Sequence, residues 1–107
     1  EAEEQKALVE YLELKKYKFT AVPNSTYTTS WSQKRHNHAM GLRPGLPDLL
    51  VIVPPKLIFI ELKRVKQSKV SSEQYQWFKA LNALGGNVYA IICKGAGEAI
   101  KLLEELK

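Results

Sequence analysis

The sequence predicts an α/β fold in which a small central mixed β-sheet is flanked by helices. Segments with helical spacing of apolar residues alternate with short β-rich runs, in the order α-β-β-β-α-β-α. The longest apolar stretches, 49–55 and 57–60, have the length of strands and are far too short to span a membrane. A chain of 107 residues suits one compact domain, and we expect residues 1–107 to form it.

The N-terminal part is predicted to be a helix followed by a short strand. In residues 1–16, Leu8 and Leu12 lie one turn apart on one helical face, and extending that face backwards reaches Glu1. Residues 18–22 are expected to form a strand that ends before a proline. A Ser- and Thr-rich segment, 24–33, is typical of a loop, as is the turn-rich segment 41–47 with its glycines and prolines.

The middle of the chain predicts an antiparallel hairpin. Residues 48–53 and 56–63 are β-rich runs joined by two prolines, and short connections of this kind link antiparallel strands. If Val53 pairs with Lys56, the register continues outward and places Asp48 opposite Glu61.

The C-terminal half is predicted to add two helices and a strand. A basic loop at 64–70 leads to a helix at 73–84, which serines just upstream can cap and two glycines can end. A strand at 87–94 and a final leucine-rich helix at 98–106 complete the fold.

Three polar side chains are expected to meet on one face of the hairpin. Glu61 and Lys63 share a face because strand side chains alternate, and Asp48 lies opposite Glu61. Two opposed carboxylates repel each other unless a cation lies between them, and oxygen ligands favour Mg²⁺ or Mn²⁺. With a lysine beside them, they fit metal-assisted hydrolysis of phosphodiesters. The alternative is that Asp48 is a turn residue and that Glu61 and Lys63 form an ordinary ion pair.

The charge distribution favours a polyanionic partner. The net charge is +5, and the segment 14–47 contains six basic residues and no acid. This pattern indicates nucleic acid, although a solvated basic surface is the alternative. Tyr27 and Trp31 could stack on bases, form a dimer contact or pack in the core. The residues expected to contact DNA phosphates are Lys34, Arg35, His36, Arg43, Arg64 and Lys66.

The single cysteine limits the compartment and the chemistry. Cys93 alone excludes an intramolecular disulfide and a cysteine-based zinc site, which favours a reducing, intracellular location. The acidic N-terminus is not typical of a signal peptide.

The ordered set of motifs resembles the PD-(D/E)XK nuclease superfamily and, within it, the VRR-NUC family, whose stand-alone members occur in phages. That family has a Glu and a Gln on its first helix, then Gly-x-Pro-Asp-Leu, Glu-Leu-Lys and Ser-x-x-Gln segments. The matching positions here are Glu1 with Gln5, 45–49, 61–63 and Ser71 with Gln74.

This resemblance implies a restriction-endonuclease-like fold and a role for each matching residue. Asp48 and Glu61 are expected to bind the Mg²⁺ or Mn²⁺ ion, with the backbone carbonyl of Leu62 as a further ligand. Lys63 is expected to be the catalytic lysine. Gln74 could reach the site from the next helix, or it could be a polar residue at the helix N-terminus.

Two residues are candidates for the metal-binding carboxylate on the first helix. Glu1 fits the family spacing best and is the expected metal ligand, while Glu4 is a second candidate one turn before Leu8. Both could instead be first-turn acids that complement the helix dipole.

The resemblance also implies a substrate and an assembly. Stand-alone members of this family resemble Holliday junction resolvases, which act as dimers, so we expect a metal-dependent, structure-selective DNA endonuclease that works as a homodimer on branched DNA. The alternatives are a nucleic-acid-binding module without catalysis and a monomeric nuclease directed to flaps or nicks. The compartment would be the cytoplasm of a bacterial host or a nucleus.

Overall fold

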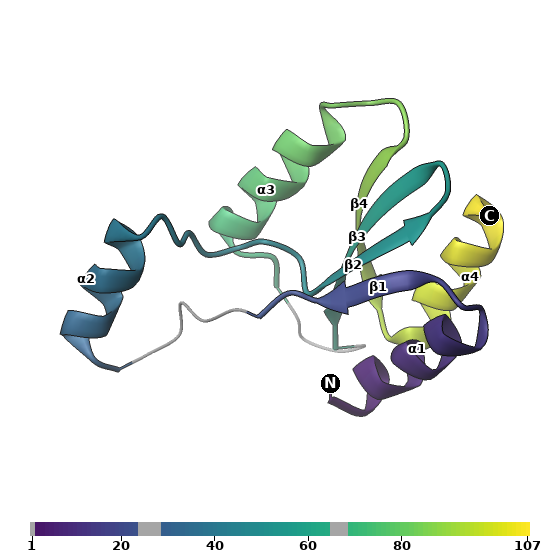
Figure 1. Cartoon of the computed structure of the whole chain (residues 1–107), viewed down its shortest axis with the longest axis horizontal. Helices are drawn as coiled ribbons and strands as arrows, with labels where there is room; N and C mark the ends of the chain where they lie inside the picture. Colours follow the sequence, from purple (N-terminus) through teal and green to yellow (C-terminus); the bar gives the residue numbers. More distant parts are fainter. Residues whose placement is uncertain (1, 24–28, 65–68) are drawn as a thin grey trace.

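The centre of the molecule is a four-stranded mixed sheet with the strand order β1-β2-β3-β4 (Figure 1). The computed structural model describes residues 2–23, 29–64 and 69–107. Strand β2 is antiparallel to both of its neighbours, β1 and β3, and β4 lies parallel to β3. The strands are β1 (Lys18–Ala21), β2 (Leu49–Val53), β3 (Lys56–Lys63) and β4 (Val88–Lys94).

The helices cover both faces of this sheet. Figure 1 shows α1 and α4 side by side on one face and α3 on the other, whereas α2 lies apart from the sheet. The helices are α1 (Ala2–Leu14), α2 (Trp31–Ala39), α3 (Ser72–Asn82) and α4 (Ala96–Leu106). Among the described helices, none combines the length and the hydropathy needed to cross a lipid bilayer.

The larger part of the core lies between the sheet and the α1–α4 pair. Leu8 and Leu12 of α1 and Leu103 of α4 are fully buried against the apolar side chains of β2 and β3. A smaller cluster on the opposite face joins Phe59 of β3 to Phe78 of α3. The fold therefore confirms the predicted mixed sheet flanked by helices.

The predicted hairpin register is confirmed. Val53 pairs with Lys56 and Leu49 pairs with Ile60, so the next position outward brings Asp48 opposite Glu61. Side chains alternate along β3, and the face that carries Phe59, Glu61 and Lys63 is the one covered by α3. The polar residues of β3 thus project toward α3 and away from the larger core.

The loop predicted at 24–33 is wrong for its last three residues. Trp31 begins the helix α2, and the side chain of Ser30 caps it by accepting a hydrogen bond from the backbone N of Gln33 at 3.2 Å. Serine favours loops because its hydroxyl bonds nearby backbone groups, and the same property makes it a good N-cap. Residues 24–28, which include Tyr27, lie outside the described residues.

The remaining element boundaries lie within two residues of their predicted positions. The first helix ends at Leu14 and not at residue 16, because Lys16 takes a left-handed backbone conformation with φ 59°. The last helix begins at Ala96, two residues before its predicted start, directly after Gly95.

Candidate active site

The two opposed carboxylates meet where β2 begins and β3 ends. Asp48 lies directly before β2 and is half-buried, and its Oδ2 accepts a hydrogen bond from the backbone N of Leu62 at 3.2 Å. Glu61, on the neighbouring strand, is 5% exposed. The hairpin thus holds both acids at one edge of the sheet, where the backbone of Leu62, the residue after Glu61, bonds to Asp48.

Glu61 is in an environment that disfavours its negative charge. Burial, and then repulsion by Asp48, raise the pKa of Glu61 from 4.5 to about 7, although the ammonium group of Lys63 acts in the opposite direction. One of its oxygens, Oε1, is buried and has no hydrogen-bond partner among the described residues. Such an oxygen, beside a second carboxylate, fits a divalent cation, because hard ions of this class bind carboxylate and carbonyl oxygens.

The described side chains supply only part of a ligand set. No cluster of three or more His, Cys, Asp or Glu side chains suited to a metal occurs within residues 2–23, 29–64 and 69–107. The donors here are therefore the carboxylates of Asp48 and Glu61, with the carbonyl of Leu62 as a backbone group. Glu1, the predicted ligand on the first helix, lies outside the described residues.

Gln74 links the acid and the lysine of β3 to helix α3. Its Nε2 donates a hydrogen bond to Glu61 Oε2 at 2.8 Å, and its Oε1 accepts one from Lys63 Nζ at 2.9 Å. The Lys63 Nζ lies 3.5 Å from Glu61 Oε2 and is largely shielded from solvent. The amide therefore fixes the positions of the carboxylate and the ammonium relative to each other.

Both roles considered for Gln74 are present together. The Ser71 hydroxyl accepts a hydrogen bond from the Gln74 backbone N, and Gln74 Oε1 accepts one from the Ser71 backbone N, each at 3.1 Å. This reciprocal pair is a capping box, which begins α3. The residue that starts the helix is thus also the residue that contacts Glu61 and Lys63.

Close backbone packing places α3 against the segment that leads to Asp48. Gly45 has φ 104°, and a Cβ added there would lie 2.7 Å from the backbone C and O of Glu73. Nearby, Trp77 Nε1 donates a hydrogen bond to the Pro44 carbonyl at 2.9 Å. Only glycine allows this approach, which brings the first turn of α3 and its Gln74 close to β3.

We expect Gly45→Ala to lower the free energy of unfolding by about 2–4 kcal/mol, because it adds both a left-handed strain and a backbone clash. Chemical denaturation measures the loss. Gly41→Ala is a matched control: Gly41 has φ 97°, but a Cβ there would contact nothing within 4 Å. Equal losses in the two variants would show that the approach to Glu73 is unimportant.

The residues predicted to contact DNA fall into two groups. Lys34, Arg35 and His36 are exposed on α2, the helix that lies apart from the sheet (Figure 1). Arg43 is exposed after α2, and its Nη1 donates hydrogen bonds to the carbonyls of His38 and Leu42, each at 2.9 Å. It therefore also holds the end of that helix.

The second group follows the strand that carries Glu61 and Lys63. Arg64 is exposed directly after β3. Lys66 lies outside the described residues.

The first turn of α1 is attached near the same edge of the sheet. Glu4 Oε1 accepts a hydrogen bond from the backbone N of Ala96 at 2.7 Å, so Glu4 satisfies the start of α4. Ala96 lies two residues after Lys94, which pairs with Lys63. The carboxylate of Glu4 is thus used at a helix end, a tertiary contact that sequence spacing does not indicate.

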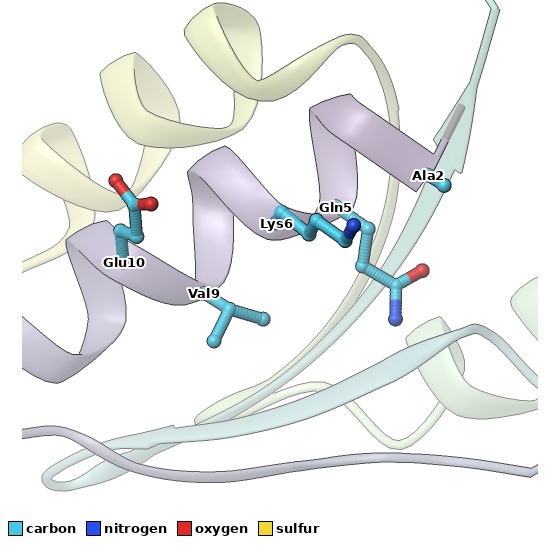
Figure 2. Close-up of a pocket in the computed structure, with 5 residues that line it drawn as sticks. All are labelled: Ala2, Gln5, Lys6, Val9 and Glu10. Carbon is cyan, nitrogen blue, oxygen red and sulfur yellow. The ribbon is translucent and has the colours of Figure 1, made fainter.

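Gln5, which matches the family's glutamine on the first helix, lines a shallow hollow along α1. Figure 2 shows its side chain, with Val9, projecting from α1 into this space of about 490 Å³. The hollow is lined by Ala2, Gln5, Lys6, Val9 and Glu10.

A mixed sheet that presents two carboxylates and a lysine at one edge has the architecture of a nuclease-type domain. The comparisons with known proteins agree: the model of the VRR-NUC domain family matches residues 1–97, and the chain belongs to this family. The placement in the PD-(D/E)XK superfamily is consistent with this match.

Solved structures with the same description have the same fold. One, described as a VRR_NUC domain protein, is 23% identical with a TM-score of 0.69, over 98% of this chain and 85% of its own. Another, described as a VRR_NUC domain, is 25% identical with a TM-score of 0.69, over 100% of this chain and 97% of its own. Among curated proteins, none matches this sequence.

Proposed function

We propose that this protein is a metal-dependent, structure-selective DNA endonuclease that hydrolyses phosphodiester bonds. The observation that carries the proposal is the buried Glu61 carboxylate, which has an orphaned oxygen, faces Asp48 and lies 3.5 Å from the Lys63 ammonium. A fold keeps repelling carboxylates together at a cost, and binding a cation for catalysis explains why it does so.

Four groups of this chain would hold the Mg²⁺ or Mn²⁺ ion. They are the carboxylates of Asp48, Glu61 and Glu1 and the backbone carbonyl of Leu62. The ion, when bound, would polarise the scissile phosphate and lower the pKa of a coordinated water molecule. The chain's own contribution includes the oxygens of Asp48, Glu61 and Leu62, which the β2–β3 hairpin would hold in place before the substrate arrives.

Lys63 would stabilise the negative charge that develops around the attacked phosphate. Its ammonium group is the positive charge closest to Glu61 among the described contacts, and Gln74 holds it in place through a hydrogen bond of 2.9 Å. Fixing the donor in advance avoids reorganisation during the reaction. Gln74 is therefore a positioning residue in this proposal, acting through Lys63 and Glu61.

The DNA backbone would lie over the two basic groups that flank this edge. Phosphate contacts supply affinity without reading sequence, which suits an enzyme selective for DNA structure. The proposed contacts are Lys34, Arg35, His36, Arg43, Arg64 and Lys66.

The proposed substrate is branched DNA, with a four-way junction as the first candidate. Such a junction is roughly two-fold symmetric and requires two cuts, which a C2 homodimer with one site per chain provides most simply. Large exposed side chains such as Trp31, Tyr75 and Leu84 could contribute to an isologous interface of roughly 1,200 Å² or more. The protein would act inside the cell, where branched DNA is found.

The decisive experiment is a cleavage assay on labelled four-way junction, flap, nicked and duplex DNA. We expect cleavage of the branched substrates with Mg²⁺ or Mn²⁺ and none in EDTA, because the acids bind the ion. Activity that persists in EDTA would overturn the metal dependence. Light scattering at micromolar concentration tests the dimer, and a monomer that cleaves only flaps or nicks would replace junction resolution. DNA binding without any cleavage would indicate a catalytically silent module.

A further inference from the structure

One face of α2 carries an aromatic side chain and three basic side-chain types at helical spacing. Successive members of this face are three, one and three positions apart in sequence, so they lie on one side of the helix. They are Trp31, Lys34, Arg35 and His38. With Ala39 they line a shallow hollow of about 310 Å³. The sequence prediction missed this face because it assigned residues 31–33 to a loop.

This face is not part of the core. No residue of α2 is buried, and Trp31 is 71% exposed. At this spacing a helix of a globular domain usually carries the apolar residues that pack against its core. A nine-residue helix is marginally stable by itself in water, so a partner that covers the face would also stabilise the helix.

The charge of the face indicates which partner fits. The helix contains no acidic residue, and the six basic residues of the segment 14–47 have no acid among them. A second copy docked through the same face would bring like charges together. Nucleic acid offers the complementary charge, and an exposed tryptophan beside cations is a stacking platform for an accessible base.

The end of α2 is connected to the segment that enters the active-site strand. Arg43 Nη1 donates hydrogen bonds to the carbonyls of His38 and Leu42, and the backbone N of Leu42 donates to the Asn37 carbonyl. Five residues beyond Arg43 lies Asp48. A short stretch of chain thus connects the end of α2 to Asp48.

We propose that this face of α2 binds the DNA substrate outside the cleavage site, with Lys34 and Arg35 on phosphates and Trp31 stacked on an unpaired base. The inference rests on the proposed function and narrows the substrate class to DNA with accessible bases at a branch point. A base inside a continuous duplex is already stacked on both sides and cannot use Trp31, whereas a base at a branch can.

Tryptophan fluorescence of the intact protein in EDTA tests this without cleavage. The chain has two tryptophans, Trp31 and the half-buried Trp77. A branched DNA with unpaired bases at its branch should quench the emission, and a blunt duplex of the same sequence should quench it much less. Trp31→Phe should remove the quenching, leaving the Trp77 signal as a control for folding.

Affinity measurements on the same two DNAs complete the test. Trp31→Leu should weaken binding of the branched DNA roughly five- to hundredfold and hardly affect the duplex, while Trp31→Phe, which keeps a stacking ring, should retain most of the preference. Replacing Lys34 and Arg35 with Gln should weaken the binding of both DNAs. It should also reduce the slope of log affinity against log salt concentration by about two units. The control pair Lys6→Gln and Lys101→Gln removes the same charge from α1 and α4 and should change the slope less.

The outcomes separate this inference from the proposed function. Branched-DNA binding that is unchanged in Trp31→Leu, in a protein that still cleaves DNA, would overturn the role of α2 alone. A wild-type protein that neither binds nor cleaves DNA would overturn both. If Trp31→Leu converts a dimer to a monomer and weakens the binding of both DNAs equally, this face of α2 is an interface between copies of the chain and the proposal is wrong.

Discussion

Asp48→Asn and Lys63→Ala should each reduce cleavage of branched DNA at least about a hundredfold while DNA binding survives. The first change removes the charge of a proposed metal ligand, and the second removes the ammonium group that would stabilise the phosphate. Neither touches the basic residues of α2, so binding measured in EDTA should stay close to wild type. Single-turnover cleavage rates and binding curves on the same DNA give the two numbers.

Lys101→Ala is a suitable control, because Lys101 is an exposed lysine on α4, across the sheet from Lys63. It should cleave at the wild-type rate. If Asp48→Asn loses DNA binding and thermal stability to the same extent as it loses cleavage activity, the two acids and Lys63 form a structural ion-pair cluster. A full cleavage rate in Lys63→Ala would remove the lysine from the mechanism.

Glu61→Gln should abolish cleavage and, at the same time, stabilise the metal-free protein by roughly 1–3 kcal/mol at pH 8. In the wild type the ionised Glu61 is buried, faces Asp48 and leaves Oε1 without a partner among the described residues. Glutamine keeps an acceptor for Gln74 and removes the repelling charge. Chemical denaturation in EDTA measures the difference in the free energy of unfolding.

The pH dependence of this difference has a definite sign. The folded-state pKa of Glu61 is raised from 4.5 to about 7, so ionisation destabilises the wild type as the pH rises through this window. The advantage of Glu61→Gln should be full above pH 7 and should shrink as the pH falls toward 4.5. Glu105→Gln, which removes a carboxylate at an exposed position of α4, is the matched control.

The effect of added Mg²⁺ or Mn²⁺ on the melting temperature is an independent test of the same site. A ligand that binds only the folded state raises the melting temperature, so the ion should stabilise the wild type and leave Glu61→Gln nearly unchanged. A Glu61→Gln protein that is less stable than wild type in EDTA would indicate that the pairing of Glu61 with Lys63 outweighs the repulsion by Asp48.

Strand periodicity allowed the centre of the candidate site to be predicted from the sequence. The two-residue connection between β2 and β3 fixes the register, and the alternation of side chains fixes the face, so the opposition of Asp48 and Glu61 follows from local rules. The position of Lys63 on the same face follows in the same way.

The contacts made by α1 and the existence of α2 could not be predicted with the same rules. Glu4 bonds to Ala96, 92 residues away in sequence, and such a pairing depends on how two helices pack. Helix α2 lacks an apolar face, which is the main signal of a helix. One local signal does exist: Ser30 precedes Gln33 by three positions, the same spacing as the pair Ser71 and Gln74 that caps α3.

The double use of Gln74 limits which side chains the position can accept. A capping box can be completed by glutamate as well as by glutamine, since either can accept the hydrogen bond from the Ser71 backbone. Only glutamine also has an N–H group to donate to Glu61, and a glutamate there would place a third carboxylate beside Glu61 and Asp48. The rule for starting a helix therefore permits two residues at this position, and the electrostatics of the neighbouring strand reduce the choice to one.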